Sequence, residues 1–298
     1  MKKLEESFGL TSQKGILPFV DDHPETWLHS IKNRALAIVR EVRPLFLENL
    51  NKGLRLMSKN MCVCNTSFDH EWRANNEGLY LLIHGLLGQP LIWNCHYQKL
   101  KNLHPEAEIR APAVPSTGNC SLEEAAAPFL ALVRDYVDKN PGNPVCLIGH
   151  SNGSRIASYI EVLLRERNVN IMVSSVSGIY QGTSVINRLA HYHIASCFLD
   201  QKVVEEMSYK SAYSRFFLGS MNTTHIKDGS LRVYHFYTTR QDAAVEPYTA
   251  ACPMMTHPLC TSQYTILSGY GHNGLVRRIC DEQSEECVNW VKNHRSKP

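Results

Sequence analysis

From residue 79 onward, the sequence alternates short, almost wholly apolar segments with longer segments of helical periodicity. The apolar segments are too short to be helices and are bounded by Gly, Pro or polar residues, which is typical of strands buried on both faces. Strands that alternate with helices predict an α/β fold, with a mostly parallel sheet covered by helices on both faces. The predicted strands are residues 79–84, 108–114, 145–150, 170–177, 231–238 and 264–269, and the predicted helices include 90–102, 121–139, 152–167 and 283–294.

Residues 1–65 precede this alternation and are predicted to form an N-terminal helical extension. Between Trp27 and Leu56, apolar residues recur at helical spacing, and basic side chains lie around the other faces. Two placements fit such a helix: it packs on the rest of the protein as an extra layer, or it lies on an anionic membrane. We favour packing, because Leu36 and Leu47 fall outside the main apolar stripe and indicate burial on more than one side.

Residues 66–298 are predicted to form one α/β domain with a helical insertion at 178–230. The insertion has no convincing strand pattern. In a parallel-sheet protein, such an insertion lies above the strand ends, where it can act as a cap over a site. The alternative, in which its helices simply pack on the body of the domain, fits the sequence equally well.

Composition and charge exclude several classes of protein. Hydrophobic residues make up 43% and charged residues 20% of the chain, which is ordinary for a globular protein with a core. A net charge of +3 without a dense Lys/Arg block argues against a nucleic-acid partner. No apolar run reaches the roughly 18 residues of a membrane span, and Glu5 and Glu6 interrupt the stretch that a secretory signal needs. We therefore expect a cytoplasmic protein, with peripheral membrane contact left open and the oligomeric state undetermined.

The ten cysteines are scattered without the spacing of a disulfide framework. In the absence of a secretory signal, we interpret most of them as free thiols in a reducing compartment. Cys62 and Cys64 form a CxC pair that can bind metal, but no second pair accompanies it, so ordinary cysteines are the favoured interpretation. The sequence predicts no metal and no organic cofactor.

Gly149, Ser151 and Gly153 form a G-x-S-x-G motif between the predicted strand 145–150 and the predicted helix 152–167. In this context the motif predicts a sharp strand-to-helix turn that exposes the serine hydroxyl above the sheet. The two glycines keep Cβ atoms out of the crowded turn. The helix N-terminus that follows favours negative charge near the serine. Ser151 is therefore the candidate nucleophile.

A serine hydroxyl is a weak nucleophile and needs a general base to remove its proton. His272 follows the last predicted strand, 264–269, within the segment SGYGHNGL. Because the carboxyl ends of parallel strands meet at one edge of a sheet, His272 is expected near Ser151. The other histidines lack this placement, so His272 is the candidate base.

The base in turn needs an acid that fixes its tautomer and stabilises its positive charge. Asp242 follows a predicted strand, and the order Ser151, Asp242, His272 along the chain is an order used by known triads. Glu246 is the main rival to Asp242. Asp200 is a weaker rival, because it falls in the middle of the predicted insertion.

An oxyanion formed during acyl transfer must be held by preorganised donors. One predicted donor is the backbone N–H of Asn152, the residue after the candidate nucleophile. The second is the N–H of Leu86, because Gly85 lets the loop after the first strand pass close to the serine. We interpret His84 as a residue that braces this loop, and His150 as one that packs under the turn.

Several of these motifs together resemble a known family. HG at 84–85, GHSNG at 149–153, Asp242 before VEP, and GHNGL at 271–275 are similar to motifs of lipases and esterases of the α/β-hydrolase superfamily. The resemblance is strongest to the triacylglycerol-lipase type with a GHSxG turn and to lipase-like inositol deacylases. It covers about residues 79–294.

The resemblance implies the α/β-hydrolase fold and hydrolysis of a carboxylic ester, with an acyl ester or a lipid as substrate and no cofactor. A thioesterase acting on acyl proteins or acyl-CoA would use the same residues, so the sequence does not separate the two activities. A non-catalytic binding module on the same scaffold is a third hypothesis. It is disfavoured because nucleophile, base, acid and oxyanion donors are all present.

Overall fold

The structure, a computed structural model, describes residues 68–69, 77–191, 195 and 199–295. The predicted N-terminal helix lies outside these residues, together with the surface by which it would pack or bind a membrane. Cys62, Cys64 and the predicted boundary after residue 65 also lie outside them. These expectations therefore stay predictions.

The described strands form one seven-stranded sheet in the order β1-β3-β2-β4-β5-β6-β7. Every neighbouring pair is parallel except β1 and β3, which run antiparallel. The prediction of a mostly parallel sheet is thus confirmed, and the carboxyl ends of the parallel strands meet at a single edge. The strands are β1 (Phe68–Asp69), β2 (Leu79–Ile83), β3 (Glu108–Ala111), β4 (Val145–His150), β5 (Ile171–Val176), β6 (Arg232–Thr239) and β7 (Cys260–Leu267).

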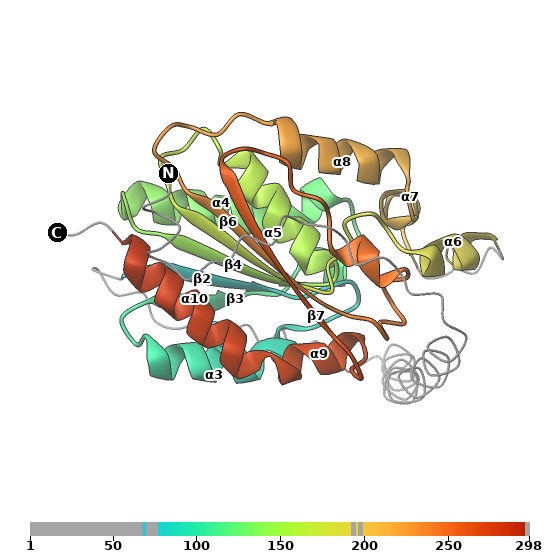
Figure 1. The fold of residues 1–298 in the computed structure, drawn as a ribbon, viewed down its shortest axis with the longest axis horizontal. Helices are drawn as coiled ribbons and strands as arrows, with labels where there is room; N and C mark the ends of the chain where they lie inside the picture. The colour runs from blue at the N-terminus through green and yellow to red at the C-terminus, as the bar shows by residue number, and fades with distance from the viewer. Residues whose placement is uncertain (1–67, 70–76, 192–194, 196–198, 296–298) are drawn as a thin grey trace, which may run out of the picture.

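Helices cover both faces of the sheet, as Figure 1 shows. α3, α9 and α10 lie on one face, and α4, α5 and α8 lie on the other, while α6 and α7 of the insertion lie beyond the end of α8. The helices are α3 (Asn94–Leu103), α4 (Leu122–Lys139), α5 (Asn152–Leu163), α6 (Ser184–His191), α7 (Gln201–Met207), α8 (Ala212–Thr223), α9 (His272–Arg278) and α10 (Cys280–His294), with the short 3-10 helices η1 (Pro90–Trp93), η2 (Pro115–Gly118) and η4 (Tyr248–Ala251).

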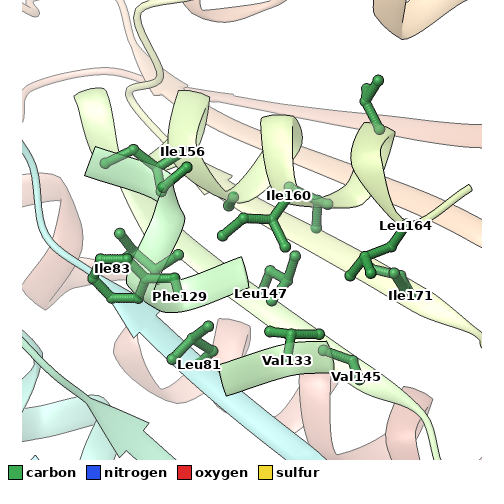
Figure 2. Close-up of a cluster of buried hydrophobic side chains, with 14 of the residues drawn as sticks. Leu81, Ile83, Phe129, Val133, Val145, Leu147, Ile156, Ile160, Leu164 and Ile171 are labelled. Atoms are coloured by element: carbon green, nitrogen blue, oxygen red, sulfur yellow. The ribbon is translucent and has the colours of Figure 1, made fainter. Parts of the chain in front are cut away.

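The core has two layers because successive side chains of a strand point to opposite faces of the sheet. In β2, Leu79, Leu81 and Ile83 join the cluster under α4 and α5, whereas Tyr80 and Leu82 join the cluster under α3 and α10. Both sets are fully buried, which explains why this strand is apolar throughout instead of alternating. Figure 2 shows part of the first cluster: Leu81, Ile83, Phe129, Val133, Val145, Leu147, Ile156, Ile160, Leu164 and Ile171.

Element boundaries agree with the predictions where local chemistry fixes them. α4 begins with the predicted capping box, in which Ser121 Oγ accepts the Glu124 N–H and the Glu124 carboxylate accepts the Ser121 N–H. β3 ends at Ala111, earlier than predicted, because Pro112 has no N–H to donate to the sheet. β7 begins at Cys260, earlier than predicted. This strand lies at the edge of the sheet and is partly exposed, so its first half lacks the apolar run of a central strand.

Two of the described cysteines form a disulfide, whereas most of the cysteines were expected to be free thiols. Cys95 of α3 and Cys280 at the start of α10 form a disulfide that links positions 185 residues apart in sequence. A pair so distant has no spacing signature, and only the packing of α3 against α10 brings the two residues together. The remaining cysteines among the described residues are free, as predicted: Cys120, Cys146, Cys252, Cys260 and Cys287.

Reduction of the Cys95–Cys280 disulfide is expected to lower the free energy of unfolding by roughly 2–5 kcal/mol, because the bond closes a very long loop in the unfolded chain. Chemical unfolding with and without a reductant measures this difference. A variant with both Cys95→Ser and Cys280→Ser serves as the control, since its stability should not respond to the reductant. Equal stability of the unmodified chain under both conditions would contradict the expectation.

The helix α8 of the insertion packs on the body of the domain. Arg165, which follows α5, is fully buried and donates to the carbonyl oxygens of Met221 at 2.9 Å and Thr224 at 3.0 Å, at the C-terminal end of α8. It is also paired with Glu161 at 3.0 Å. Phe217 of α8 belongs to the core under α4 and α5. These contacts fix α8 on the body of the domain, and the role of the insertion as a cap stays a prediction.

Candidate active site

The G-x-S-x-G motif forms the predicted turn between β4 and α5. Ser151 is the N-cap of α5, with φ 56° and ψ −124°, a backbone conformation that L-residues rarely adopt. Its N–H donates to the Val176 carbonyl of β5 at 2.9 Å, which anchors the turn to the neighbouring strand. The strained serine therefore sits at the carboxyl edge of the sheet and at a helix N-terminus, where negative charge is favoured.

The glycines around Ser151 are required by close backbone contacts. A Cβ on Gly153 would lie 2.1 Å from the Ile83 carbonyl oxygen, and a Cβ on Gly149 would lie 2.5 Å from the Gly153 carbonyl oxygen. A Cβ on Gly85 would lie 2.7 Å from Ser151 Cβ. The loop after β2 thus passes directly against Ser151, as the sequence predicted.

His272 and Asp242 come from different loops and meet at the same edge. His272 is the first residue of α9, and its Nδ1 lies 2.9 Å from Oδ2 and 3.1 Å from Oδ1 of Asp242. Because a carboxylate only accepts, Nδ1 carries the proton and donates it, which makes Nε2 the basic nitrogen of the neutral ring. The two loops are tied together, since Thr239 Oγ1 donates to the Tyr270 carbonyl at 2.9 Å.

Asp242 is held as a carboxylate by its surroundings. Its Oδ1 accepts the backbone N–H groups of Ala244 at 2.9 Å and Val245 at 2.8 Å. Burial alone raises the pKa of Asp242, but the charge and hydrogen bond of His272 and the Val245 N–H outweigh burial and hold the pKa below its usual value. The group is therefore ionised throughout the neutral range.

The two rival carboxylates are engaged elsewhere. Glu246 pairs with Arg188 at 2.6 Å and accepts a hydrogen bond from Ser184 at 3.1 Å, both on α6. Asp200 caps α7 by accepting the Lys202 N–H at 2.8 Å. Both carboxylates thus bind groups of the insertion. The carboxylate beside His272 is that of Asp242, as predicted.

His150 packs under the turn and supports His272. The centroids of the two rings are 4.5 Å apart, and His150 Nε2 lies 3.3 Å from the His272 carbonyl oxygen, to which it donates. Burial, assisted by His272, lowers the pKa of His150 well below its ordinary value, so His150 stays neutral and does not compete as a base.

His84 braces the loop after β2. Its Nε2 accepts the Val114 N–H at 2.9 Å, and its Nδ1 donates to the Gly85 carbonyl at 2.9 Å. Both ring nitrogens are therefore committed, and the tautomer is fixed. This agrees with our interpretation of His84 as a structural residue of the loop.

Gly118 lies against the predicted donor Leu86 N–H and against the side-chain amide of Asn152. A Cβ on Gly118, which has φ 81°, would lie 3.6 Å from Leu86 N and 3.7 Å from Asn152 Nδ2. Among the described residues, the Leu86 N–H has no acceptor. The Asn152 N–H is the first of α5 and has no partner within the helix. Both groups can thus donate to a ligand.

Sequence reasoning missed a buried charged pair behind Asn152. Arg155 of α5 is fully buried, and its guanidinium lies 3.7 Å from the carboxylate of Glu206 on α7. The same carboxylate accepts the Leu122 N–H at the start of α4 at 3.1 Å. Glu206 lies within an ordinary helical pattern of the insertion, so nothing in the sequence places it beside α5. The one available signal is that Arg155 lies one helical turn after Asn152.

The stability of the protein is expected to depend on pH through Glu206. Burial raises the pKa of Glu206 to about 7, and Arg155 only partly offsets this effect. A carboxyl group whose folded pKa is raised contributes stability at low pH, below its unfolded pKa, and loses that contribution as the pH rises through about 7. Relative to the unmodified chain, Glu206→Gln should therefore gain unfolding free energy between about pH 5 and pH 8, because Gln does not ionise.

Urea unfolding of both proteins at the two pH values measures this relative change. Glu205→Gln is a matched control, since Glu205 neighbours Glu206 on α7 but is exposed. A difference between Glu206→Gln and the unmodified chain that does not vary with pH would contradict the expectation.

The described residues hold neither a metal-binding cluster nor a membrane-spanning helix. Within that part of the chain, no cluster of His, Cys, Asp and Glu side chains has the arrangement of a metal site. None of the helices described combines the length and the apolar character needed to cross a bilayer.

Comparison with known proteins gives matches at the level of structure. No protein-family model matches the sequence, and no curated protein matches it significantly. An arylesterase structure matches with a TM-score of 0.55 at 14% identity, over 89% of this chain and 98% of that chain. A peroxisomal α/β-hydrolase from Saccharomyces cerevisiae matches with a TM-score of 0.52 at 10% identity, over 80% of this chain and 87% of that chain. A structure from work on two metagenome-derived lipolytic enzymes gives a TM-score of 0.51 at 12% identity, over 79% of this chain and 100% of that chain.

The chain has the α/β-hydrolase fold, which confirms the fold implied by its motifs. At identities of 10 to 14%, the likeness concerns the fold, which hosts many chemistries. The activity of this chain must therefore be argued from its own site.

Proposed function

We propose that this protein is a serine hydrolase that cleaves a carboxylic ester. Ser151 is the nucleophile, His272 the general base and Asp242 the acid that orients the base. The observation that carries the proposal is the pairing of His272 with a buried carboxylate at the sheet edge that holds the strained turn at Ser151. A serine in such a turn, with a histidine of fixed tautomer at the same edge, has what nucleophilic catalysis requires.

In the first half of the reaction, Ser151 Oγ attacks the acyl carbon while Nε2 of His272 takes the hydroxyl proton. The carbonyl π electrons move to oxygen, and the resulting oxyanion accepts the N–H groups of Leu86 and Asn152. Asp242 stabilises the imidazolium through the hydrogen bond to Nδ1. When the tetrahedral intermediate collapses, the bond to the leaving alcohol breaks, and the alcohol takes the proton from Nε2.

In the second half, a water molecule replaces the alcohol. His272 removes one proton from the water as its oxygen attacks the acyl carbon of the acyl-enzyme, and the same two N–H groups hold the second oxyanion. The bond between the acyl carbon and Ser151 Oγ then breaks, Oγ recovers the proton from Nε2, and the free acid leaves. Every proton and electron pair in this scheme is supplied by the ester, by water or by these side chains, so the scheme needs no cofactor.

A fluorophosphonate probe tests the proposal directly. The probe should form a covalent adduct, and peptide mass spectrometry should locate the adduct on Ser151. Parallel assays with an acyl ester and the thioester of the same acyl chain then define the leaving group, because an oxygen and a sulfur ester use the same triad. A folded protein that neither labels nor hydrolyses either substrate would instead support the binding-module hypothesis.

A further inference from the structure

The buried arginine of α5 contacts the residue that follows the candidate nucleophile. Arg155 Nη1 donates to Asn152 Oδ1 at 3.3 Å. On the other side of the guanidinium, Nη2 lies 3.7 Å from Glu206 Oε2, and the rings of Tyr213 and Phe217 lie 5.6 Å and 6.0 Å away. The guanidinium is thus held between the insertion and Asn152.

This contact determines which way the Asn152 amide faces. A guanidinium carries donors and no acceptor, so the amide oxygen must be the atom that faces Arg155. The amide nitrogen then faces the opposite direction, where a Cβ on Gly118 would lie 3.7 Å from it and 3.6 Å from Leu86 N. Among the described residues, Asn152 Nδ2 has no acceptor. The side-chain amide nitrogen of Asn152 and the predicted oxyanion donor Leu86 N therefore both lie beside Gly118.

Burial of the Arg155 guanidinium costs free energy, and a purely structural contact does not require such a charge. Arg155 is fully buried, and among the described residues its Nε and Nη2 atoms make no hydrogen bond. Replacement of a buried ion pair by apolar side chains is often neutral or stabilising, so packing of α5 against α7 and α8 does not require this charge. The contact that an apolar residue cannot reproduce is the hydrogen bond to Asn152.

We propose that the side-chain amide of Asn152 is a further donor to the bound ester, and that Arg155, held by Glu206, is the positioning residue that aims it. The inference rests on the proposed function, because it assigns a role at the same site. It makes the insertion a part of the catalytic apparatus through α7, which supplies Glu206. The donor acts on the oxygen that gains negative charge, so it strengthens as the transition state forms.

Kinetics of Asn152→Ala, Arg155→Met and the double variant test the proposal on an ester that the unmodified chain hydrolyses. Asn152→Ala keeps the backbone N–H and loses the amide, so kcat should fall about 100-fold with little change in KM. Arg155→Met should lower kcat by a similar factor, because the amide is no longer aimed. The double variant should be no slower than Asn152→Ala, since both changes remove the same interaction.

Arg165→Met is the matched control. Arg165 is also a fully buried arginine that ties α5 to the insertion, but its contacts are with Glu161 and the end of α8. This variant should lose stability and keep the kcat of the unmodified chain per folded molecule. If Arg155→Met does not fold, Asn152→Asp takes its place. A carboxylate there accepts from Arg155 and places negative charge where the donor was, so kcat should fall by more than about 100-fold.

An unchanged kcat in Asn152→Ala or in Asn152→Asp overturns the inference, and so do losses that multiply in the double variant. The proposed function is tested separately by Ser151→Ala. If Ser151→Ala abolishes hydrolysis while Asn152→Ala leaves kcat unchanged, the inference about the amide fails and the triad stands. If Ser151→Ala retains hydrolysis, the triad itself is wrong.

Discussion

Replacement of Ser151 by alanine is expected to abolish covalent labelling and to lower ester hydrolysis by about 10⁴-fold or more. The variant retains the predicted oxyanion donors and the binding surface, so a small residual activity above that of water should remain. The fold should persist, because alanine has the same Cβ at this positive φ and the anchoring bond of the turn comes from the backbone N–H. Stopped-flow or steady-state hydrolysis and gel fluorescence of the labelled protein measure the two effects.

The matched control is Ser154, the other serine beside the turn. Its hydroxyl is fully buried and donates to the Gly149 carbonyl at 2.8 Å, so it is not placed to attack a substrate. Ser154→Ala should still be labelled, and its cost should appear in stability. Labelling that survives Ser151→Ala and disappears in Ser154→Ala would assign the nucleophile to Ser154.

Asp242→Asn is expected to lower kcat by about 10⁴-fold without loss of the fold. The reason is the direction of the hydrogen bonds. Oδ1 of Asp242 accepts the N–H groups of Ala244 and Val245, so an asparagine would keep its oxygen on that side and turn its NH₂ group toward His272. Nδ1 would then have to accept, which leaves the proton on Nε2, and a ring in that tautomer cannot take the proton of Ser151.

The activity of Glu246→Gln completes this test. Glu246 pairs with Arg188 on α6 and lies in the same loop as Asp242, so it is a matched carboxylate. Glu246→Gln should keep kcat within a few-fold of the unmodified chain. Full activity in Asp242→Asn together with a large loss in Glu246→Gln would transfer the role of the acid to Glu246.

The sequence was sufficient to predict the features that depend on local backbone conformation and on strand order. A central strand buried on both faces must be apolar throughout, so β2, β4 and β5 were recognisable one by one. A turn as sharp as the one at Ser151 demands glycine on both sides, so the spacing of Gly149 and Gly153 is enough to place the serine at the turn. Because parallel strands end at one edge, the residues after β6 and β7 were expected to meet there.

Other features depend on contacts between segments that are distant in sequence. The sequence favoured Asp242, but only the hydrogen bonds of both carboxylates separated it from its rival Glu246, since each follows β6 closely. The Cys95–Cys280 disulfide needed the packing of α3 against α10. These pairs have no shared periodicity, because tertiary contact is set by how whole elements pack and not by the spacing of residues along the chain.

By itself, the sequence determined the mostly parallel α/β sheet of this protein, the sharp serine turn and the loop that carries His272, because each depends on local conformation or on strand order. Only the tertiary structure determined which carboxylate faces the histidine, how α7 and α8 pack on α5, and that Arg155 lies between Glu206 and the amide of Asn152. A buried charge is paired by whatever the fold brings next to it, and a linear sequence does not state that neighbour.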